Sequence, residues 1–485
     1  MSNVNQQLEQ IAASLEDSDS KLSSIVNGGI TTVVQTGSGP QPSYAKWRHD
    51  NEAFFEQAAQ KAETEANRAK TEADRANTFA DNSAYVTQQR LTEQSTLDLN
   101  FSRGKYLVDD GSLLETSAAL DVLSVVRSTP KWVFGPNGLL REVAPNTLAR
   151  AWNPETGEPL GALIEPSATN NLTFSGFQNG VSDAPARGGL ISAVTTGWNG
   201  ELPQNGIAFG HDGVTNSYAY KAYNLEDGVS YTFSVFVEMD DGLPPVFNSG
   251  QTVTNDFVFA MESAVIQPTS AEYVGGGVYR LSVTKTAAAT TGANVGVVKY
   301  FNNTNRTFKV SGYQLEQGAV ATSYIPTNGA PVTRAADDVS RTLGGEFNAE
   351  QGTVLVSFDT PINYTGYKFA ATLGDSNLDR VSIGLLPGTV AFSQVRGSSD
   401  MTKVEVNVTP GSKVFGAVSY NNVTGDCAFA VNGVSNVGVN TFTTNNPRLL
   451  IGSQISSDKL SSIVNYCKYI PRALSAAELE ELTAI

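Results

Sequence analysis

The most regular apolar pattern in the chain is a row of alanines in a charged stretch between residues 55 and 80. The alanines recur at alternating steps of four and three residues, which is the spacing of positions a and d in a heptad repeat. This spacing predicts an α-helical coiled coil over residues 46–95. Its buried positions would be Phe55, Ala59, Ala62, Ala66, Ala69, Ala73, Ala76 and Ala80.

One helix with this seam buries too little apolar surface to be stable alone, because each methyl group contributes about a kilocalorie per mole or less. Glu65 at position g and Lys70 at position e are spaced so that opposite charges meet between parallel helices. The seam therefore predicts a parallel homo-oligomer, but alanines alone do not specify the number of helices. The alternative is a single helix whose alanine stripe packs on the globular part of the chain.

Residues 1–45 are predicted to form a helix and a linker. Apolar side chains recur at the same steps from Val4 to Ile25, which predicts a helix that ends at Gly28 and Gly29. Gly, Pro and Ser punctuate residues 28–45, as in linkers. The helix would either form a second coil or dock on a partner through its apolar face.

From residue 96 onward, short alternating runs replace the helical pattern. In YTFSVFV at 231–237, Tyr231, Phe233, Val235 and Val237 share one face of a strand. Repeated runs of this kind between Gly and Asp turns predict a β-rich collar at 96–168 and two antiparallel β-sandwiches in series, at 169–343 and 344–485. The fold class is thus mainly β with an N-terminal coiled coil. Ser475 and Glu478 form a capping box, which predicts a short final helix.

Composition excludes several classes of function. The chain carries 48 Asp and Glu against 32 Lys and Arg, a net charge of −16. This balance argues against nucleic acid or an anionic membrane as a partner, because phosphate groups are bound by clustered cations. The N-terminus lacks the basic and apolar regions of a signal peptide, and no apolar run is long enough to span a membrane. We therefore expect a soluble protein that is not exported by a standard signal.

Metal and cofactor sites are not predicted. The chain contains two histidines and two cysteines, which argues against a zinc site of the usual ligand kinds. Cys427 and Cys467 would be buried thiols, or a disulfide if their strands are neighbours. Asp375 and Asp379 in the turn GDSNLD are minor candidates for calcium ligands, although such residues more often stabilise a turn.

Three stretches resemble parts of tailed-bacteriophage fibre and appendage proteins. Residues 124–172 resemble the connector of those proteins, and residues 311–340 resemble the closing strand and tail of their carbohydrate-binding-like jelly-roll modules. The last module resembles their laminin-G-like or concanavalin-A-like sandwich. The matching positions are Arg127, Gly138–Leu140, Arg150, Trp152, Pro154–Gly157, Leu163–Glu165 and Asn170–Leu172 in the connector; Gln314–Glu316, Thr322–Thr327 and Thr333–Asp337 in the jelly roll; and Gly352–Thr353, Ala430–Gly433, Leu450–Gly452, Tyr469–Ser475 and Glu478–Leu479 in the last sandwich.

This resemblance implies a structural fibre protein of a bacteriophage virion, assembled in the host cytoplasm as a homotrimer. Residues 1–45 would attach it to other virion proteins, and its sandwiches would bind polysaccharide on the host cell surface. A head fibre or capsid decoration protein without a dedicated receptor is the first alternative. A polysaccharide-degrading tailspike is the second, but the sequence shows no catalytic motif and no repeat that would build a parallel β-helix. We therefore predict that the chain is not an enzyme.

A sugar site needs flat aromatic surfaces and planar polar groups. The stretch from residue 198 to residue 223 is the richest in such side chains. The alternative is that its tyrosines are strand residues that fill the sandwich core. Likewise, Glu316 and Arg334 are expected to hold the closing strand and not to act in catalysis. The candidate glycan-binding residues are Trp198, His211, Asp212, Tyr218, Tyr220 and Tyr223.

Overall fold

The computed structural model describes residues 33–36, 39–42, 95–196, 198, 203–247, 254–262, 264–397, 400–444, 446–454 and 459–484. The chain divides into two compact units, Met1–Gln89 and Arg90–Ile485. The described part of the first unit is an antiparallel hairpin of β1 (Val33–Thr36) and β2 (Gly39–Pro42). The predicted coiled-coil positions from Phe55 to Ala80 lie outside the described residues.

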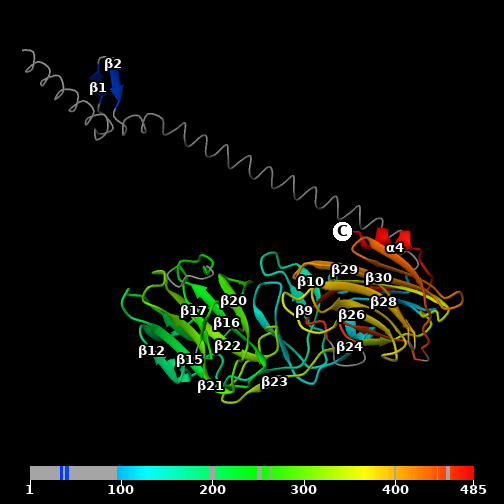
Figure 1. The fold of residues 1–485 in the computed structure, drawn as a ribbon, viewed down its shortest axis with the longest axis horizontal. Helices are drawn as coiled ribbons and strands as arrows, with labels where there is room; N and C mark the ends of the chain where they lie inside the picture. The colour runs from blue at the N-terminus through cyan, green and yellow to red at the C-terminus, as the bar shows by residue number, and fades with distance from the viewer. Residues whose placement is uncertain are drawn as a thin grey trace, which may run out of the picture. The chain divides into compact units, whose positions relative to one another are not determined.

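The second unit contains a sandwich built largely from the C-terminal part of the chain, here called the C-terminal sandwich (Figure 1). We name its two antiparallel sheets I and II. Across sheet I the strands are β32 (Val434–Val439), β31 (Asp426–Val431), β30 (Lys413–Asn421), β25 (Gln351–Asp359), β34 (Ser462–Ile470), β3 (Leu97–Asn100), β4 (Lys105–Asp109) and β5 (Leu113–Thr116), while β10 (Pro159–Ile164) joins β34 to β9 (Arg150–Trp152). Across sheet II they are β29 (Asp400–Asn407), β28 (Val390–Gly397), β27 (Arg380–Leu386), β26 (Lys368–Gly374), β33 (Arg448–Ile451), β24 (Asp338–Thr342) and β6 (Ser124–Val126).

The residues predicted to form a separate collar, 96–168, instead extend both sheets of this sandwich. Strand β34 pairs with β3 through Tyr466–Tyr469 and with β10 through Ser462–Val464. In sheet II, β6 pairs with β24. What is left of the collar is a hairpin of β7 (Lys131–Phe134) and β8 (Leu140–Val143). The sandwich is therefore assembled from segments that are far apart in the sequence.

A second sandwich is inserted between β10 and β24, and we call it the inserted sandwich (green in Figure 1). A short pair of β11 (Ala168–Asn170) and β23 (Val332–Arg334) joins its two ends. Sheet III contains β12 (Ala186–Gly188), β15 (Ser217–Leu225), β21 (Thr291–Lys299), β17 (Val258–Met261) and β18 (Ala264–Ile266). Sheet IV contains β13 (Ile191–Thr195), β14 (Asn205–Phe209), β22 (Phe308–Gln317), β16 (Ser230–Met239), β20 (Val278–Thr286) and β19 (Ser270–Gly275).

The alternation that predicted the strands is seen in the packing. Tyr231, Phe233, Val235 and Val237 of β16 all lie in the core between sheets III and IV. Phe236, on the other face of β16, packs against the β7–β8 hairpin, where the ring of Phe134 lies edge-on at 6.1 Å. The outer face of sheet IV is therefore covered in this region.

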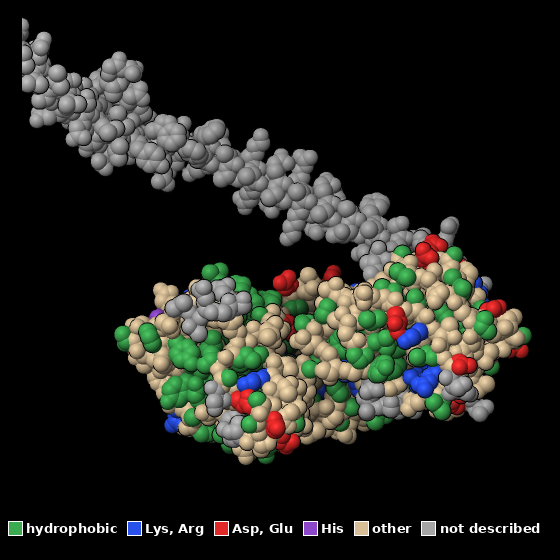
Figure 2. Space-filling view, viewed as in Figure 1, with side chains coloured by type: hydrophobic (Ala, Val, Ile, Leu, Met, Phe, Trp, Pro, Cys, Tyr) green, Lys and Arg blue, Asp and Glu red, His purple; other side chains and the backbone are tan. Residues whose placement is uncertain are grey.

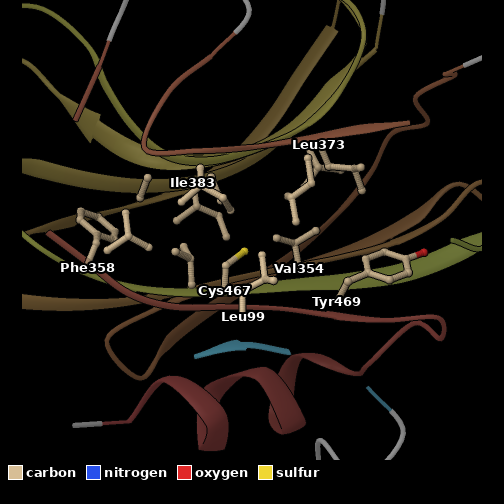
Figure 3. Packing of buried hydrophobic residues seen from close by; sticks show 14 of the residues in the cluster. Leu99, Val354, Phe358, Leu373, Ile383, Cys467 and Tyr469 are labelled. Carbon is tan, nitrogen blue, oxygen red and sulfur yellow. The ribbon is translucent and has the colours of Figure 1, made fainter. Parts of the chain in front are cut away.

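The core of the C-terminal sandwich lies between sheets I and II (Figure 3). Leu99 of β3 and Cys467 of β34 pack there with Leu373 and Ile383 of sheet II. Burial of each such side chain stabilises the fold by about 1.5–3 kcal/mol. Strand β3, from the predicted collar, thus belongs to this core.

A short helix covers the outer face of sheet I. Helix α4 (Ala476–Thr483) packs Leu479 and Leu482 against Leu355 and Ile470. The predicted capping box is confirmed: Ser475 Oγ accepts a hydrogen bond from the backbone N–H of Glu478, whose side chain accepts one from the backbone N–H of Ser475. Among the described residues, no helix has the length and apolar character needed to cross a lipid bilayer.

Both cysteines are free and buried. Burial raises the pKa of Cys427 to about 11, and burial also raises the pKa of Cys467. A buried thiol that stays protonated is a weak nucleophile. The two cysteines therefore contribute to packing.

Charged groups are buried where the chain enters and leaves the inserted sandwich. Asp337 accepts hydrogen bonds from Arg127 Nη1 at 2.8 Å, Lys131 Nζ at 2.7 Å and the backbone N–H of Glu165 at 2.9 Å. Lys131 Nζ also lies 2.9 Å from Glu165 Oε2. Burial alone would raise the pKa of Glu165, but the nearby cations Lys131 and Arg334 hold it far below its usual range. We call Arg127, Lys131, Glu165, Arg334 and Asp337 the junction network.

The closing strand β22 is held by further buried polar groups. Glu316 accepts hydrogen bonds from Gln314 Nε2 at 2.7 Å and from Thr322 Oγ1 at 2.5 Å, and burial raises its pKa. Asn170 Nδ2 donates to the carbonyls of Tyr313 and Ile325. Glu316 therefore helps to hold β22 in place, and Arg334 Nη2 donates a hydrogen bond to the carbonyl of Pro166 at 2.8 Å.

Replacing Lys131 with methionine tests the junction network. The substitution leaves Glu165 and Asp337 buried without their shared cation, which typically costs about 3–5 kcal/mol. We expect a loss of this size in the free energy of unfolding, measured with denaturant. Lys413→Met is the control, because Lys413 lies 4.0 Å from Asp359 with 48% of its side chain exposed, and such pairs contribute about 1 kcal/mol at most. Equal losses in the two variants would contradict the assignment.

Candidate functional site

An aromatic cluster lies on the outer face of sheet III, and we call its three rings, Tyr218, Tyr220 and Tyr300, the tyrosine face. Side chains alternate along β15, so Ala219 and Lys221 turn towards the core while Tyr218 and Tyr220 turn outwards. The three tyrosines pack on Val258, Ala260 and Val298 and are each only partly buried. The cluster therefore presents aromatic surface to solvent.

The rings of Tyr218 and Tyr220 are held in a fixed arrangement. They are stacked, with centroids 5.0 Å apart and planes inclined at 23°. Tyr218 is paired in register with Gly188 of β12, where an added Cβ would come within 2.9 Å of the ring. Gly188 therefore leaves the space that the ring of Tyr218 occupies.

The phenol group of Tyr220 remains protonated at physiological pH. Burial raises the pKa of Tyr220 to about 12, and the neighbouring phenols Tyr300 and Tyr218 add to this shift. A neutral tyrosine offers a flat apolar ring together with a hydroxyl group that both donates and accepts hydrogen bonds. These are the two kinds of contact that the C–H face and the hydroxyl groups of a sugar require.

The structure separates Tyr223 and Trp198 from the tyrosine face. Tyr223 lies on the core side of β15, where its ring is 5.9 Å from that of Tyr231. Trp198 is only 6% exposed and packs with Phe236 in the cluster beneath the β7–β8 hairpin. Its Nε1 donates a hydrogen bond to Glu238 Oε2 at 2.5 Å. The ring of Trp198 therefore fills a packed interior, while Tyr223 is partly buried on the opposite face of β15 from Tyr218 and Tyr220.

His211 and Asp212 lie in the loop between β14 and β15. Asp212 is exposed, and its carboxylate accepts hydrogen bonds from the backbone N–H groups of Val214 and Thr215 at 2.9 and 2.8 Å. These hydrogen bonds lower its pKa. Asp212 therefore stabilises a turn, while His211 beside it is partly buried.

Sequence reasoning missed Tyr300. In VGVVKY, Val298 and Tyr300 have the same parity, and strand β21 pairs Val298 directly with Tyr218. Continuing the period-two alternation beyond β21 would have placed Tyr300 on the outer face with Val298. The pairing of β21 with β15 was needed to bring the third tyrosine to the other two.

A cavity of about 310 Å³ lies between the outer face of sheet IV and the segment β7–β10. Trp132 and Trp152 are among its walls, with Glu165, Glu272 and Arg280. Glu165 is bound by Lys131 and by Ser323, whose N–H and Oγ each donate at 2.7 Å. Glu272 is thus the carboxylate of this cavity that lies outside the junction network.

The calcium candidates lie around the turn after β26. Asp375 Oδ2 accepts a hydrogen bond from the backbone N–H of Asn446 at 3.2 Å, and Asp379 immediately precedes β27. Within the described residues, no group of three or more His, Cys, Asp and Glu side chains is placed to hold a metal ion. Asp375 thus helps to join two loops.

Surface charge is distributed without a large basic region on the face shown in Figure 2. Lys and Arg side chains form small separate groups there, between Asp and Glu side chains and wide uncharged areas. This distribution agrees with the net charge of −16. The described residues on this face do not form the continuous row of cations that binds a nucleic-acid backbone.

Comparison with known proteins gives only distant likenesses. No protein-family model matches the chain, and no curated protein matches it. Solved structures that are weakly similar include carbohydrate-binding β-sandwich domains. The CBM40 of the Ruminococcus gnavus IT-sialidase, bound to α2,3-sialyllactose, is 14% identical over 28% of this chain and 84% of that chain, with a TM-score of 0.24.

Two other structures give similar values. Domain 4 of an extracellular arabinanase from Geobacillus stearothermophilus, in complex with arabinotriose, is 17% identical over 34% of this chain and 82% of that chain, with a TM-score of 0.26. A heptameric SAP-like pentraxin from Limulus polyphemus is 12% identical over 27% of this chain and 69% of that chain, with a TM-score of 0.22. Likenesses at this level carry no functional argument for this chain.

Trp198→Ala separates packing from binding. Removing a buried indole typically costs about 3–5 kcal/mol, because it leaves a cavity. We expect a clear fall in the thermal unfolding temperature. Trp198→Phe keeps most of the volume and loses mainly the hydrogen bond to Glu238, so its fall should be smaller. An unchanged unfolding temperature in Trp198→Ala would show that the indole is not part of the core.

Proposed function

We propose that this protein is a glycan-binding fibre or appendage protein of a bacteriophage virion, which attaches the particle to polysaccharide on the host cell surface. The tyrosine face carries the glycan-binding part of the proposal. Two stacked phenol rings and a third neighbour form a fixed, partly exposed aromatic surface on an open sheet. Such a surface packs against the apolar face of a sugar, and the phenol hydroxyl groups form hydrogen bonds with the hydroxyl groups of the sugar.

The role is binding and not catalysis. A glycosidase of the common kind needs two carboxyl groups on opposite sides of the scissile bond, in protonation states suited to acid and base. At the tyrosine face the cluster consists of tyrosines and aliphatic side chains. The proposed contacts of these side chains hold the glycan through ring surfaces and hydroxyl groups.

The fibre part of the proposal rests on the sequence. The heptad seam from Phe55 to Ala80 supports a parallel homo-oligomer, and the resemblance to phage appendage proteins supports a trimer attached to the virion through residues 1–45. Three copies would present three tyrosine faces to one surface. Simultaneous engagement can raise overall affinity by about a hundredfold or more without any new contact.

Tyr220→Ala in the full-length chain tests the binding role. Glycans retained by the unaltered protein on an array of bacterial surface polysaccharides would be measured again as soluble oligosaccharides by isothermal titration calorimetry. We expect at least tenfold weaker binding, which corresponds to about 1.4 kcal/mol. Tyr218→Ala should act in the same direction.

Two tyrosines serve as controls for that experiment. Tyr223→Phe lies on the same strand but on its core face, and Tyr273→Ala removes one ring of a pair inclined at 57° on sheet IV. Both should retain the glycan affinity of the unaltered protein. Equal affinity in Tyr220→Ala would exclude the tyrosine face as the binding surface.

Charges placed in the alanine seam test the oligomer. Light scattering of the full chain should give about three times its mass of 51.4 kDa. Ala66→Asp with Ala73→Asp puts a carboxylate at two a positions and should reduce the mass to that of one chain, because a charge in the seam is not solvated. Ala53→Asp, at an outward b position, should leave the mass unchanged. A single-chain mass for the unaltered protein would exclude the coiled-coil trimer.

A further inference from the structure

The cavity of about 310 Å³ beside the β7–β8 hairpin is separate from the tyrosine face, because its floor belongs to sheet IV and not to sheet III. This volume lies within the range of about 300–1,000 Å³ that small-molecule sites occupy. Its walls come from both sandwiches, so we call it the inter-sandwich cavity. The lining residues that matter most here are Trp132, Ser270, Glu272, Arg280, Ser282 and Asn363.

The floor of the inter-sandwich cavity is polar. Strand register places Ser270 of β19 opposite Ser282 of β20, and Glu272 opposite Arg280. Arg280 is in turn opposite Phe236 of β16, whose ring packs towards the β7–β8 hairpin. The two pairs therefore share the outer face of sheet IV, where they form a polar strip.

The polar groups of this strip are available to a ligand. Glu272 is exposed, and neither its carboxylate nor the hydroxyl groups of Ser270 and Ser282 form a hydrogen bond with another described residue. Arg280 Nη2 donates to Ser234 Oγ at 3.0 Å, and Ser234 is the described residue with which this guanidinium forms a hydrogen bond. Because a guanidinium has five N–H donors, this contact orients Arg280 and leaves donors for a ligand.

The hairpin side of the cavity provides an aromatic wall. Trp132 of β7 packs beside Phe236 and Tyr324 but is only partly buried, so part of its ring surface is exposed. Trp152 also lines the cavity, but the guanidinium of Arg150 already lies over its ring, at 4.9 Å. Trp132 is therefore the ring that the cavity offers to a ligand.

The C-terminal sandwich forms a third side. Ile362 and Asn363 follow β25 and are both exposed, and Ser461 and Ser462 line the cavity at the start of β34. A ligand in this cavity would therefore contact both sandwiches. Since it would bind only when the two sandwiches are folded and joined, it would also stabilise the chain against unfolding.

The charges around the cavity are balanced. Glu272 lies opposite Arg280, and Glu165 is paired with Lys131 and Arg334 at 2.9 and 3.6 Å. A charged ligand would disturb this balance. A neutral ligand with several hydroxyl groups would keep it, because one hydroxyl group can donate to a carboxylate while another accepts from a guanidinium.

We propose that the inter-sandwich cavity binds a neutral pyranose residue. The C–H face of the sugar ring packs on Trp132, and the sugar hydroxyl groups donate to Glu272 and accept from Arg280. The proposal rests on the glycan-binding role proposed above and adds a second site, on the other sheet of the inserted sandwich. A polysaccharide is then bound through two separate surfaces of one chain.

Tryptophan fluorescence of the full-length Tyr220→Ala chain tests this assignment, because the variant removes a ring of the tyrosine face and the cavity retains two tryptophans. The probes are methyl glucoside, methyl galactoside, methyl mannoside and methyl N-acetylglucosaminide. At least one should give a saturable change, and cyclohexanol, which has a single hydroxyl group, should bind at least about tenfold more weakly.

Three results would overturn the proposal. The first is the absence of binding by all four glycosides, both in fluorescence and in saturation-transfer NMR. The second is equal binding of cyclohexanol, which would show that the polar strip does not take part. The third is tighter binding of methyl glucuronide than of the neutral glycosides, which would contradict the assignment to a neutral sugar.

Variants locate the site and separate it from the tyrosine face. Glu272→Ala should weaken glycoside binding by about tenfold, because it removes a charged hydrogen-bond acceptor. Glu350→Ala is the matched control and should have no effect, since Glu350 is exposed and does not line the cavity. Trp132→Leu should weaken binding in the same direction as Glu272→Ala. Unchanged affinity in Glu272→Ala and Trp132→Leu would exclude this cavity, whereas failure of the tyrosine face would appear only as unchanged affinity in Tyr220→Ala.

Discussion

The junction network is the interaction on which the arrangement of the second unit depends. Asp337 accepts hydrogen bonds from Arg127, which precedes β7, and from Lys131, the first residue of β7. It also accepts one from the backbone N–H of Glu165, where the chain leaves β10. These charges are buried, and an uncompensated buried charge costs several kcal/mol. The network therefore holds the two crossings into and out of the inserted sandwich together, so that β6, β10 and β24 can all belong to the C-terminal sandwich.

The same network explains which sequence signals were informative. Leu163–Glu165 and Thr333–Asp337 are among the positions that resemble phage appendage proteins. In the structure, the charged residues of these two segments belong to the junction network. The strand alternation in residues 231–237 and the capping box at Ser475 also predicted local structure correctly, because both patterns act within a few residues. The collar was wrong for the opposite reason: β3 has only four residues and pairs with β34 near the other end of the chain, and a local pattern contains no information on that pairing.

The sequence also predicted only part of the candidate site. Tyr218, Tyr220 and Tyr223 were grouped by proximity in sequence, but strand parity puts Tyr223 in the core and leaves the other two outside. The sequence around Trp198 has no clear period, and its burial depends on Phe236 and Glu238 of β16. The place of Tyr300 depends on the register between strands. The sequence shows which side chains have suitable chemistry. Only the pairing of the strands shows which of these side chains lie together on one face of a sheet.

Each sandwich covers the outer face of one sheet, and the inserted sandwich carries partly exposed tyrosines on the outer face of the other. Helix α4 covers sheet I, and the β7–β8 hairpin packs on sheet IV. The tyrosine face lies on sheet III, which has no comparable cover over these residues in the described structure. Large aromatic side chains on an open face give up burial that would stabilise the fold. Under the proposed function, ligand binding accounts for the retention of the stacked rings of Tyr218 and Tyr220 on this face.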